Sequence, residues 1–249
     1  MKIVVAMKQI PDLQQIRIRN REPVLDDVPL TFGNIDKNAL EAAVQIKEAF
    51  GGQVIALCVG SNELEDTVKE ALAAGADEAV LIIYEGSLAS NQTAHLIAMA
   101  VRDLGSVDLV IMGEGSGDNY SSQVGSRVAQ ILGWPQAGYV NRLDVLGDKI
   151  QATRSLEDSE EVLEAAFPAV VTVTSDINQA RIPSVTQILK AGKKPRESRY
   201  ADQVSGAIPA PLIETISNLA PENQRRQRTL NSVADLVKAL DSEGFGGKR

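Results

Sequence analysis

Five short, almost continuously apolar runs recur along the first part of the chain and constrain its fold more than any other feature. They are rich in Val, Ile and Leu and span Lys2–Met7, Gln53–Val59, Ala79–Ile83, Val107–Met112 and Ala169–Thr174. Such runs are typical of strands in a sheet covered on both faces. Amphipathic segments alternate with them at Lys37–Phe50, Glu63–Ala74, Leu88–Leu104 and Ser121–Leu132. The alternation predicts an α/β fold with a doubly wound, mostly parallel sheet.

The segment Tyr139–Ala165 interrupts this alternation. Two strand-like stretches flank the dipeptide Gly147-Asp148, and an acidic cluster and a further apolar stretch follow. A Gly-Asp dipeptide suits the two-residue loop of a β-hairpin. We therefore expect an antiparallel excursion at the edge of the sheet.

The character of the chain changes near residue 190. A short helix, Val185–Ala191 with Ser184 as its N-cap, is expected there, and a final amphipathic helix is expected at Val233–Leu240. The stretch between them is rich in Pro, Ser, Gln and Arg and has too little apolar periodicity to bury a core of its own. The sequence predicts an α/β domain over residues 1–190 and an extended basic arm with a C-terminal helix over residues 191–249.

The distribution of charge argues against several classes of partner. The formal net charge is −8, from 25 Lys and Arg against 33 Asp and Glu, which disfavours nonspecific binding to nucleic acids or anionic membranes. The segment from Arg181 to Leu230 is an exception, because nine basic minus four acidic residues give it +5 and leave −13 for the remainder. Such a segment is typical of a solvated arm or of an arm that docks on a partner.

The composition also narrows the chemistry. One cysteine, Cys58, and one histidine, His95, cannot form an internal disulfide or supply the three protein ligands of a catalytic zinc site. No nucleophile–base pair is recognisable, so we expect no catalysis by side chains. No signal peptide is evident, and no apolar run approaches the roughly 20 residues that cross a bilayer. We therefore expect a cytoplasmic protein without membrane insertion.

Three loops are candidates for a ligand site, because ligands of open α/β sheets bind beyond the carboxyl ends of the strands. They are Met7–Pro11, Phe32–Asp36 and Gly113–Gln123, the last of which reads GEGSGDNYSSQ. Its alternate glycines permit unusual backbone conformations and a close approach of amides to a ligand. The residues Ser121–Gln123 lie near the expected helix start, where free N–H groups favour a phosphate. We interpret this loop as a phosphate cradle.

Other interpretations of the glycine loop stay open at this point. The loop lacks the lysine of a P-loop and the spacing of the dinucleotide fingerprint, so a flexible strand-to-helix connection would fit the same pattern. Asp118 suits a cap or turn as well as it suits a contact to a ribose.

Six ordered blocks of sequence resemble one known family. They are KIVVAMKQIP at Lys2–Pro11, NALEA at Asn38–Ala42, GAD at Gly75–Asp77, the loop Gly113–Gly125, PAVVTV at Pro168–Val173 and RIPSVTQILKAGKKP at Arg181–Pro195. In order and spacing they resemble the β-subunits of electron transfer flavoproteins, and the GEGSGD loop, the LED turn and the SDIN stretch are most similar to the nitrogen-fixation-associated (Fix-type) branch. The resemblance implies a doubly wound, adenine-nucleotide-binding fold, for which we expect the flavodoxin-like strand order.

The resemblance further implies a heterodimer. A partner α-subunit would hold one FAD, and this chain would hold AMP or, as in electron-bifurcating members, a second FAD. Carried over position by position, the nucleotide contacts of the family fall on Ala6, Gly33, Asn34, Ile35, Asp36, Val59, Gly113, Glu114, Gly115, Ser116, Gly117, Asp118, Asn119, Tyr120, Ser121, Ser122, Gln123 and Val124. All of these positions except Val59 lie in or next to the three loops singled out above.

Two departures from the AMP-binding members favour FAD. The segment before the first helix reads Phe32-Gly33-Asn34-Ile35-Asp36, without the asparagine-proline pair that many of those members carry. In the glycine loop, Asp118 is followed by Asn119-Tyr120 where they carry further acids. Fewer carboxylates would repel a diphosphate less.

The resemblance also implies surfaces for protein partners. The segment equivalent to residues 176–190 is a recognition loop for an acyl-CoA-type or other dehydrogenase, and the residues assigned to it are Asp176, Asn178, Arg181, Val185, Ile188 and Lys190. Val185 matches the aliphatic anchor, although packing on its own sheet would also explain it. Arg154 matches an arginine close to the α-subunit flavin. Because Thr153 and Ser155 replace neighbouring glutamates, its role stays open.

These implications describe an electron-carrier subunit, and they leave open whether the heterodimer oxidises NADH at a β-bound flavin and bifurcates the electrons. A stand-alone ATP- or AMP-binding stress-type module is the alternative, but it would have no use for the chain beyond Ser175. An adenylate-using enzyme is disfavoured, since Lys8-Gln9-Ile10-Pro11 stands where a pyrophosphate loop would be required.

Overall fold

The computed structural model describes residues 1–222 and 227–245, and these form two compact units. The first unit comprises Met1–Arg17 and Val24–Ser217, and the second comprises Ile18–Pro23 and the residues from Asn218 onward. Four bases of the predicted arm, Arg225, Arg226, Lys248 and Arg249, lie outside the described residues.

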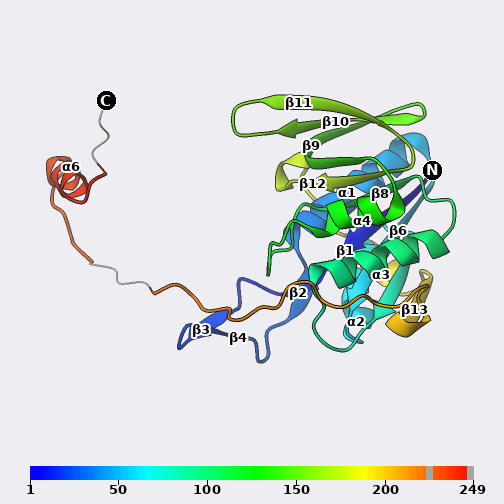
Figure 1. The fold of residues 1–249 in the computed structure, drawn as a ribbon, viewed down its shortest axis with the longest axis horizontal. Coiled ribbons are helices and arrows are strands. Elements are labelled where there is room, and N and C mark those ends of the chain that lie inside the picture. The colour runs from blue at the N-terminus through cyan, green and yellow to red at the C-terminus, as the bar shows by residue number, and fades with distance from the viewer. Residues whose placement is uncertain (223–226, 246–249) are drawn as a thin grey trace. The chain divides into compact units, whose positions relative to one another are not determined.

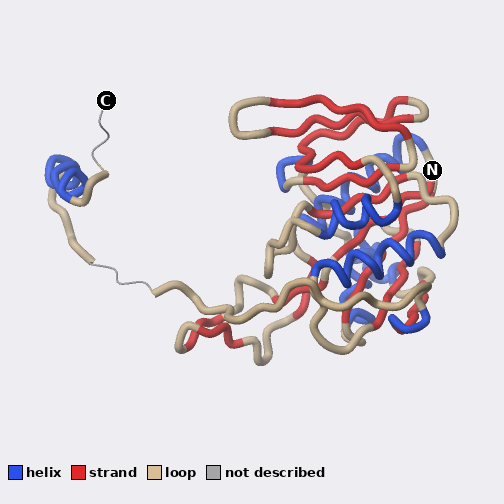
Figure 2. Tube along the Cα trace, viewed as in Figure 1, coloured by secondary structure: helices blue, strands red, loops and turns tan. Residues whose placement is uncertain are grey.

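The first unit is built on one large sheet (Figures 1 and 2). Among the described residues it has nine strands, in the order β11 (Glu160–Ala166), β10 (Lys149–Ser155), β9 (Gln136–Leu146), β12 (Ala169–Val173), β8 (Leu109–Gly113), β1 (Lys2–Met7), β6 (Gln53–Gly60), β7 (Glu78–Ile83) and β13 (Arg196–Tyr200). Neighbouring strands run parallel from β9 through to β13, and β10 runs antiparallel to β9 and β11. The predicted doubly wound α/β fold is confirmed.

The order of the core strands corrects one prediction. Numbered along the chain, the five predicted strands are arranged 3-2-1-4-5 rather than in the flavodoxin-like order 2-1-3-4-5. Both orders arise from the same alternation of strands and helices, so the sequence pattern does not decide between them. In the observed order the chain reverses direction across the sheet between β1 and β8, and this is the point at which ligands bind in such sheets.

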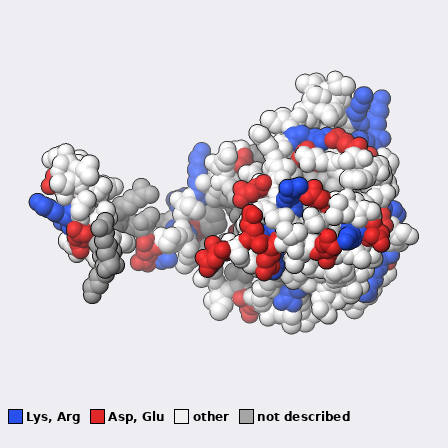
Figure 3. Space-filling view, turned by 90° about the horizontal axis from the view of Figure 1, so that it is seen from above, with Lys and Arg blue, Asp and Glu red and all other residues white. Residues whose placement is uncertain are grey.

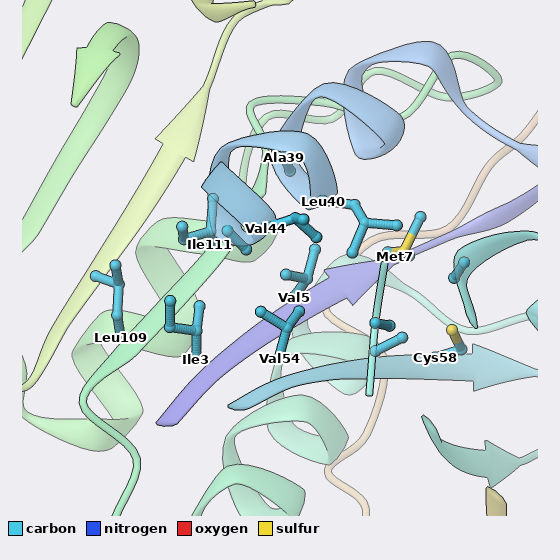
Figure 4. Packing of buried hydrophobic residues seen from close by; sticks show 14 of the residues in the cluster. Ile3, Val5, Met7, Ala39, Leu40, Val44, Val54, Cys58, Leu109 and Ile111 are labelled. Atoms are coloured by element: carbon cyan, nitrogen blue, oxygen red, sulfur yellow. The ribbon is translucent and has the colours of Figure 1, made fainter. Parts of the chain in front are cut away.

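Helices cover both faces of this sheet. The first face carries α1 (Asn34–Phe50), α2 (Leu64–Ala74) and α5 (Val185–Ala191), and the second carries α3 (Ser90–Asp103) and α4 (Val124–Leu132). Ile3, Val5 and Met7 of β1 are buried against the first layer, and Figure 4 shows them with side chains of α1. Val4 and Ala6 point the other way, into the second layer. Burial of this apolar area on both faces stabilises the sheet.

The predicted antiparallel excursion is also confirmed. Gly147 and Asp148 join β9 to β10, Leu146 pairs with Lys149, and Gly147 adopts a φ of +67°. Two ion pairs link β10 to β11: Lys149–Glu164 at 2.5 Å and Arg154–Glu161 at 2.5 Å. Figure 3, which views the molecule from the side of β11, shows acidic and basic side chains interspersed over this face. Charged side chains of this kind protect an edge strand from pairing with another chain.

Residues beyond 190 contribute more structure to the first unit than the sequence suggested. β13 pairs in parallel with β7, and Lys194 donates hydrogen bonds to the carbonyl groups of Leu72 and Ala76 at 2.7 and 2.5 Å. The chain then crosses α3, where Ala201 and Val204 are buried. β13 was missed because its sequence, RESRY, has no apolar alternation and most of its side chains are exposed.

The remaining elements are short. β2 (Gln9–Pro11) pairs with β5 (Leu30–Phe32), β3 (Arg17–Arg19) pairs with β4 (Glu22–Val24), and two 3-10 turns occupy Ser175–Ile177 and Ala201–Gln203. In the second unit, α6 (Val233–Ser242) is capped by the Ser232 side chain, which accepts a hydrogen bond from the Asp235 amide at 3.2 Å. No helix in the described parts of the chain is long and apolar enough to cross a membrane.

Candidate functional site

Four chain segments meet where β1 and β8 end. β1 ends at Met7 and β8 at Gly113, while α1 begins at Asn34 and α4 begins at Val124. α1 lies directly against the end of β8, since a methyl group added at Gly113 would be 3.0 Å from Cγ2 of Ile35. The predicted loops therefore converge at the switch point of the sheet. Ala6 and Val59 lie near the carboxyl ends of β1 and β6, at the same edge.

Asp36 ties the ends of the two central strands together. Its side chain is buried, with 6% of the residue exposed, and it accepts a backbone hydrogen bond from Lys8 at 3.4 Å. Burial raises its pKa to about 7, although hydrogen bonds from the backbone of Lys8 and Gly113 and the charge of Lys8 act in the opposite direction. The carboxyl group faces the interior, so it positions the two loops.

The glycines of the loop Gly113–Gln123 serve a different purpose from the predicted one. Gly113, Gly115 and Gly117 do not adopt positive φ angles, so the prediction of unusual glycine conformations is wrong. The left-handed conformations fall on Tyr120 (φ 43°) and Ser122 (φ 52°).

The loop glycines are required for space. A methyl group at Gly115 would lie 3.1 Å from the ring of Tyr120, and one at Gly117 would lie 3.0 Å from Cδ1 of Leu13. Because real Cβ contacts are seldom this close, a side chain at either position would require Tyr120 or Leu13 to shift by a few tenths of an ångström. The amide of Tyr120 closes the turn by donating to the carbonyl of Ser116 at 2.9 Å.

Lys8 reaches from the end of β1 to the glycine loop. Its Nζ lies 2.8 and 2.6 Å from the two carboxylate oxygens of Asp118 and 3.5 Å from the hydroxyl of Ser116. Partial burial alone would raise the pKa of Asp118, but hydrogen bonds from Lys8 and Ser116 outweigh it and lower the pKa. The side chain of Asp118 therefore acts as a partner of Lys8. The sequence singled out the loop Met7–Pro11 but not Lys8 itself. The signal that could have identified Lys8 was its position directly after β1.

Two helix starts at the switch point lack a side-chain cap. The side chain of Gln123, the N-cap of α4, instead accepts hydrogen bonds from Ser90 at 3.1 Å and Arg127 at 2.9 Å. Gly33, the N-cap of α1, has no side chain to offer. Uncapped N–H groups and the positive end of the helix dipole favour an anion. α4 begins three residues later than predicted, since a φ of 52° at Ser122 is incompatible with a helix.

The remaining polar groups of the loop are partly engaged with one another. The hydroxyl of Tyr120 donates to Glu114 at 2.5 Å, and this bond raises the pKa of Tyr120 to about 12. Asn119 and Ser121 are exposed beside them. All candidate nucleotide residues from Gly113 to Val124 thus belong to one loop and the helix start that follows it.

Arg154 lies away from these loops. It is on β10, opposite Val140 of β9, and β9 and β12 separate it from β8. Its guanidinium donates to Glu161 of β11 at 2.8 and 2.5 Å.

The predicted recognition segment is fastened to the outside of α1. Asn178 and Asn38 exchange hydrogen bonds, with Asn38 Nδ2 2.8 Å from the carbonyl of Asn178 and Asn178 Nδ2 3.0 Å from that of Asn38. Arg181 binds two carboxylates of α1, those of Glu41 and Glu48. The polar groups of Asn178 and Arg181 are therefore occupied within the chain, and Asp176 lies exposed in the preceding turn.

α5 presents aliphatic side chains to the surface. Ser184 and Gln187 form a capping box that fixes its first turn. Val185 is 74% exposed and Ile188 57% exposed, so Val185 does not pack on its own sheet. Ile182 and Leu189 extend the same exposed surface, and Lys190 lies at its end.

Comparison with known proteins agrees with this geometry. The model of the electron transfer flavoprotein domain matches residues 24–204. The electron transfer flavoprotein subunit beta of Thermoanaerobacterium thermosaccharolyticum is 35% identical over 198 residues, which are 78% of this chain and 76% of that protein. The chain therefore belongs to the electron transfer flavoprotein family, as a β-subunit.

Proposed function

We propose that the crevice between β1 and β8 binds the adenylate part of a nucleotide, and that this nucleotide is FAD rather than AMP. The observation that carries the proposal is the meeting of two helix starts without side-chain caps at the switch point of the sheet. Backbone N–H groups of the loop from Gly113 to Val124 would hold the phosphates. The glycine packing keeps those groups close to the crevice.

The preference for FAD rests on the state of the carboxylates around the crevice. Asp118 is paired with Lys8, and Glu114 accepts a hydrogen bond from Tyr120. Asp36 is buried, and its pKa of about 7 leaves part of it neutral at neutral pH. Little uncompensated negative charge therefore faces the site, so a diphosphate is repelled less than it would be by free carboxylates.

Chemistry in this subunit would come from the cofactor, because a flavin supplies reversible uptake of electrons. The chain's own residues bind the phosphates, orient the nucleotide and hold the loops together through Asp36 and Lys8. Oxidation of NADH and division of its electrons between two acceptors would require a flavin in this crevice, so we propose bifurcation only together with FAD.

We propose two protein partners. The exposed aliphatic surface of Ile182, Val185, Ile188 and Leu189 would dock a dehydrogenase of the acyl-CoA type or another oxidoreductase. An α-subunit that carries FAD would complete the heterodimer, and the basic residues beyond 190 would contact it. The proposal places the heterodimer in the cytoplasm, in keeping with a single cysteine, Cys58, that is buried and free.

Nucleotide analysis of the heterodimer tests the proposal. The chain would be co-expressed with its α-subunit, the complex denatured, and FAD and AMP counted per heterodimer. Two FAD molecules are expected. One FAD with one AMP would overturn the preference for FAD and with it bifurcation, and an α-bound FAD alone would overturn the site.

A pair of glycine variants tests whether the nucleotide counted in this way is bound in the proposed crevice. Gly117→Val would press against Leu13 and Ile10, so the nucleotide content of this subunit should fall. Gly192→Val serves as the matched control, because the nearest atom to a methyl group there is the carbonyl oxygen of Leu189, at 3.9 Å. Equal loss in both variants would contradict the proposed location.

A further inference from the structure

Lys8 bridges the two sides of the nucleotide crevice. At the end of β1, the backbone N–H of Lys8 donates to the carboxylate of Asp36 in α1. The side chain of Lys8 extends to the glycine loop. There Nζ contacts both oxygens of Asp118 and the hydroxyl of Ser116. A lysine ammonium has three protons to donate, and these contacts engage all of them within the chain.

The ion pair with Asp118 is of a kind that another anion can displace. The side chains of Lys8 and Asp118 are 41% and 26% exposed, and partly exposed pairs of this sort contribute little to stability. A phosphate carries more charge than a carboxylate and offers more acceptor oxygens. Nζ is already anchored next to the loop in which the phosphates are proposed to bind, so a phosphate needs only to replace one partner.

We propose that Lys8 determines the selectivity of this site for phosphorylated nucleosides, and that Asp118 is its internal counter-ion, which the phosphate of the bound nucleotide displaces. The inference rests on the proposed function, since it requires an adenine nucleotide in this crevice. Asp118 then competes with the phosphate for Lys8 and does not contact the ribose.

The affinities for AMP and adenosine isolate the contribution of the phosphate. Both would be measured calorimetrically on the nucleotide-free full chain. Lys8→Gln should weaken AMP binding about tenfold, the usual effect of losing one charge-assisted hydrogen bond, and leave adenosine binding unchanged. A loss of equal size for both ligands would show that Lys8 only supports the loop, and this would overturn the inference.

The variant Asp118→Asn should act in the opposite direction. Removing the counter-ion frees Lys8, so AMP should bind several-fold more tightly while adenosine binds as before. If Asp118 contacted the ribose, Asp118→Asn would weaken both ligands, and the inference would be wrong. In the double variant with Lys8→Gln, the gain from Asp118→Asn should vanish, because no cation is left to be released.

Two further variants complete the test. Lys8→Arg keeps the charge and should retain most of the AMP preference. Lys149→Gln removes a lysine of equal exposure, 41%, from its pair with Glu164 on the excursion, and it should change neither affinity. If the unaltered chain binds neither AMP nor adenosine, the proposed function itself fails. If it binds both, but the ratio of their affinities is the same in Lys8→Gln, only the inference about Lys8 fails.

Discussion

Arg181 holds the buried carboxylate of Glu41 with two hydrogen bonds, from Nε to Oε2 at 2.6 Å and from Nη2 to Oε1 at 3.0 Å. The same guanidinium binds Glu48, about two turns further along α1, at 2.7 and 3.0 Å. Arg181 directly precedes the residues that carry the exposed aliphatic surface. This contact therefore fixes the proposed docking surface relative to the sheet.

Arg181→Ala should destabilise the folded chain. Glu41 is 6% exposed, so the substitution leaves a buried carboxylate without its charged partner, although Gln45 and the backbone N–H of residue 181 still donate to it. We expect the free energy of unfolding to fall by about 3 kcal/mol. Urea unfolding at neutral pH measures the change. Arg142→Ala is the matched control, because both side chains of its ion pair with Asp144 are exposed. The free energy of unfolding should change by less than about 0.5 kcal/mol in this variant. Equal effects would contradict the anchoring role.

The same contact predicts a dependence on pH. Burial alone would raise the pKa of Glu41, but hydrogen bonds from Arg181 lower it. A lowered pKa contributes stability that is present above the unfolded value of about 4.3 and is lost as the pH falls through the folded value. The difference in unfolding free energy between the unaltered chain and Arg181→Ala should therefore shrink below about pH 4. A constant difference down to about pH 2 would contradict this assignment.

Asp36 should produce the opposite dependence. Burial raises its pKa from 3.8 to about 7, so the folded chain retains a proton that the unfolded chain loses. The associated stability is present below pH 3.8 and is lost as the pH rises through about 7. Relative to Asp36→Asn, the unaltered chain should lose up to about 4 kcal/mol between about pH 4 and about pH 8.

Unfolding titrations of both proteins across this range measure that difference. Asp118→Asn is the control for the direction of the pH effect. The pKa of Asp118 is lowered, so its contribution to the free energy of unfolding should not change above about pH 5. A flat difference between the unaltered chain and Asp36→Asn would show that Asp36 is ionised in the folded chain throughout.

The sequence predicted the elements whose apolar pattern is set by burial on the sheet. β1 was predicted at its observed bounds, and α1 and β6 to within three residues, because their buried faces leave a clear period. The sequence of β13 shows no such period. β13 is held by backbone pairing with β7, and most of its side chains face solvent.

At the site, the sequence located the loops but not the contacts inside them. Glycine spacing indicated a cradle, whereas the structure shows the side chains of Tyr120 and Leu13 packed close to Gly115 and Gly117, and those neighbours are set by the tertiary fold. Lys8 and Asp118 are 110 residues apart in the chain, so no local pattern could pair them. Strand order was likewise a property of the whole sheet.

Gly125→Ala should disturb the start of α4. A methyl group at Gly125 would lie 2.2 Å from Cγ2 of Thr172 in β12, so helix and strand would have to separate. We expect a loss of about 2 kcal/mol in the free energy of unfolding, as is usual for overpacking, together with weaker nucleotide binding. Thr172→Ser removes the opposing methyl group, so adding it to Gly125→Ala should restore much of the loss. Gly192→Ala, at an open position, should have no effect, and a double variant no better than Gly125→Ala would contradict the packing argument.

Val185→Ser combined with Ile188→Ser should separate docking from folding. Both side chains are more than half exposed, so the free energy of unfolding should change by less than about 0.5 kcal/mol. If these side chains dock a dehydrogenase, the reduction of the heterodimer's flavin by an acyl-CoA-type dehydrogenase from the same source should slow by about tenfold or more in stopped-flow measurements. Val162→Ser on β11 is the control, because Val162 is 60% exposed on the distant excursion and its loss should leave the rate unchanged. Equal rates in all three proteins would assign the docking surface to another part of the chain.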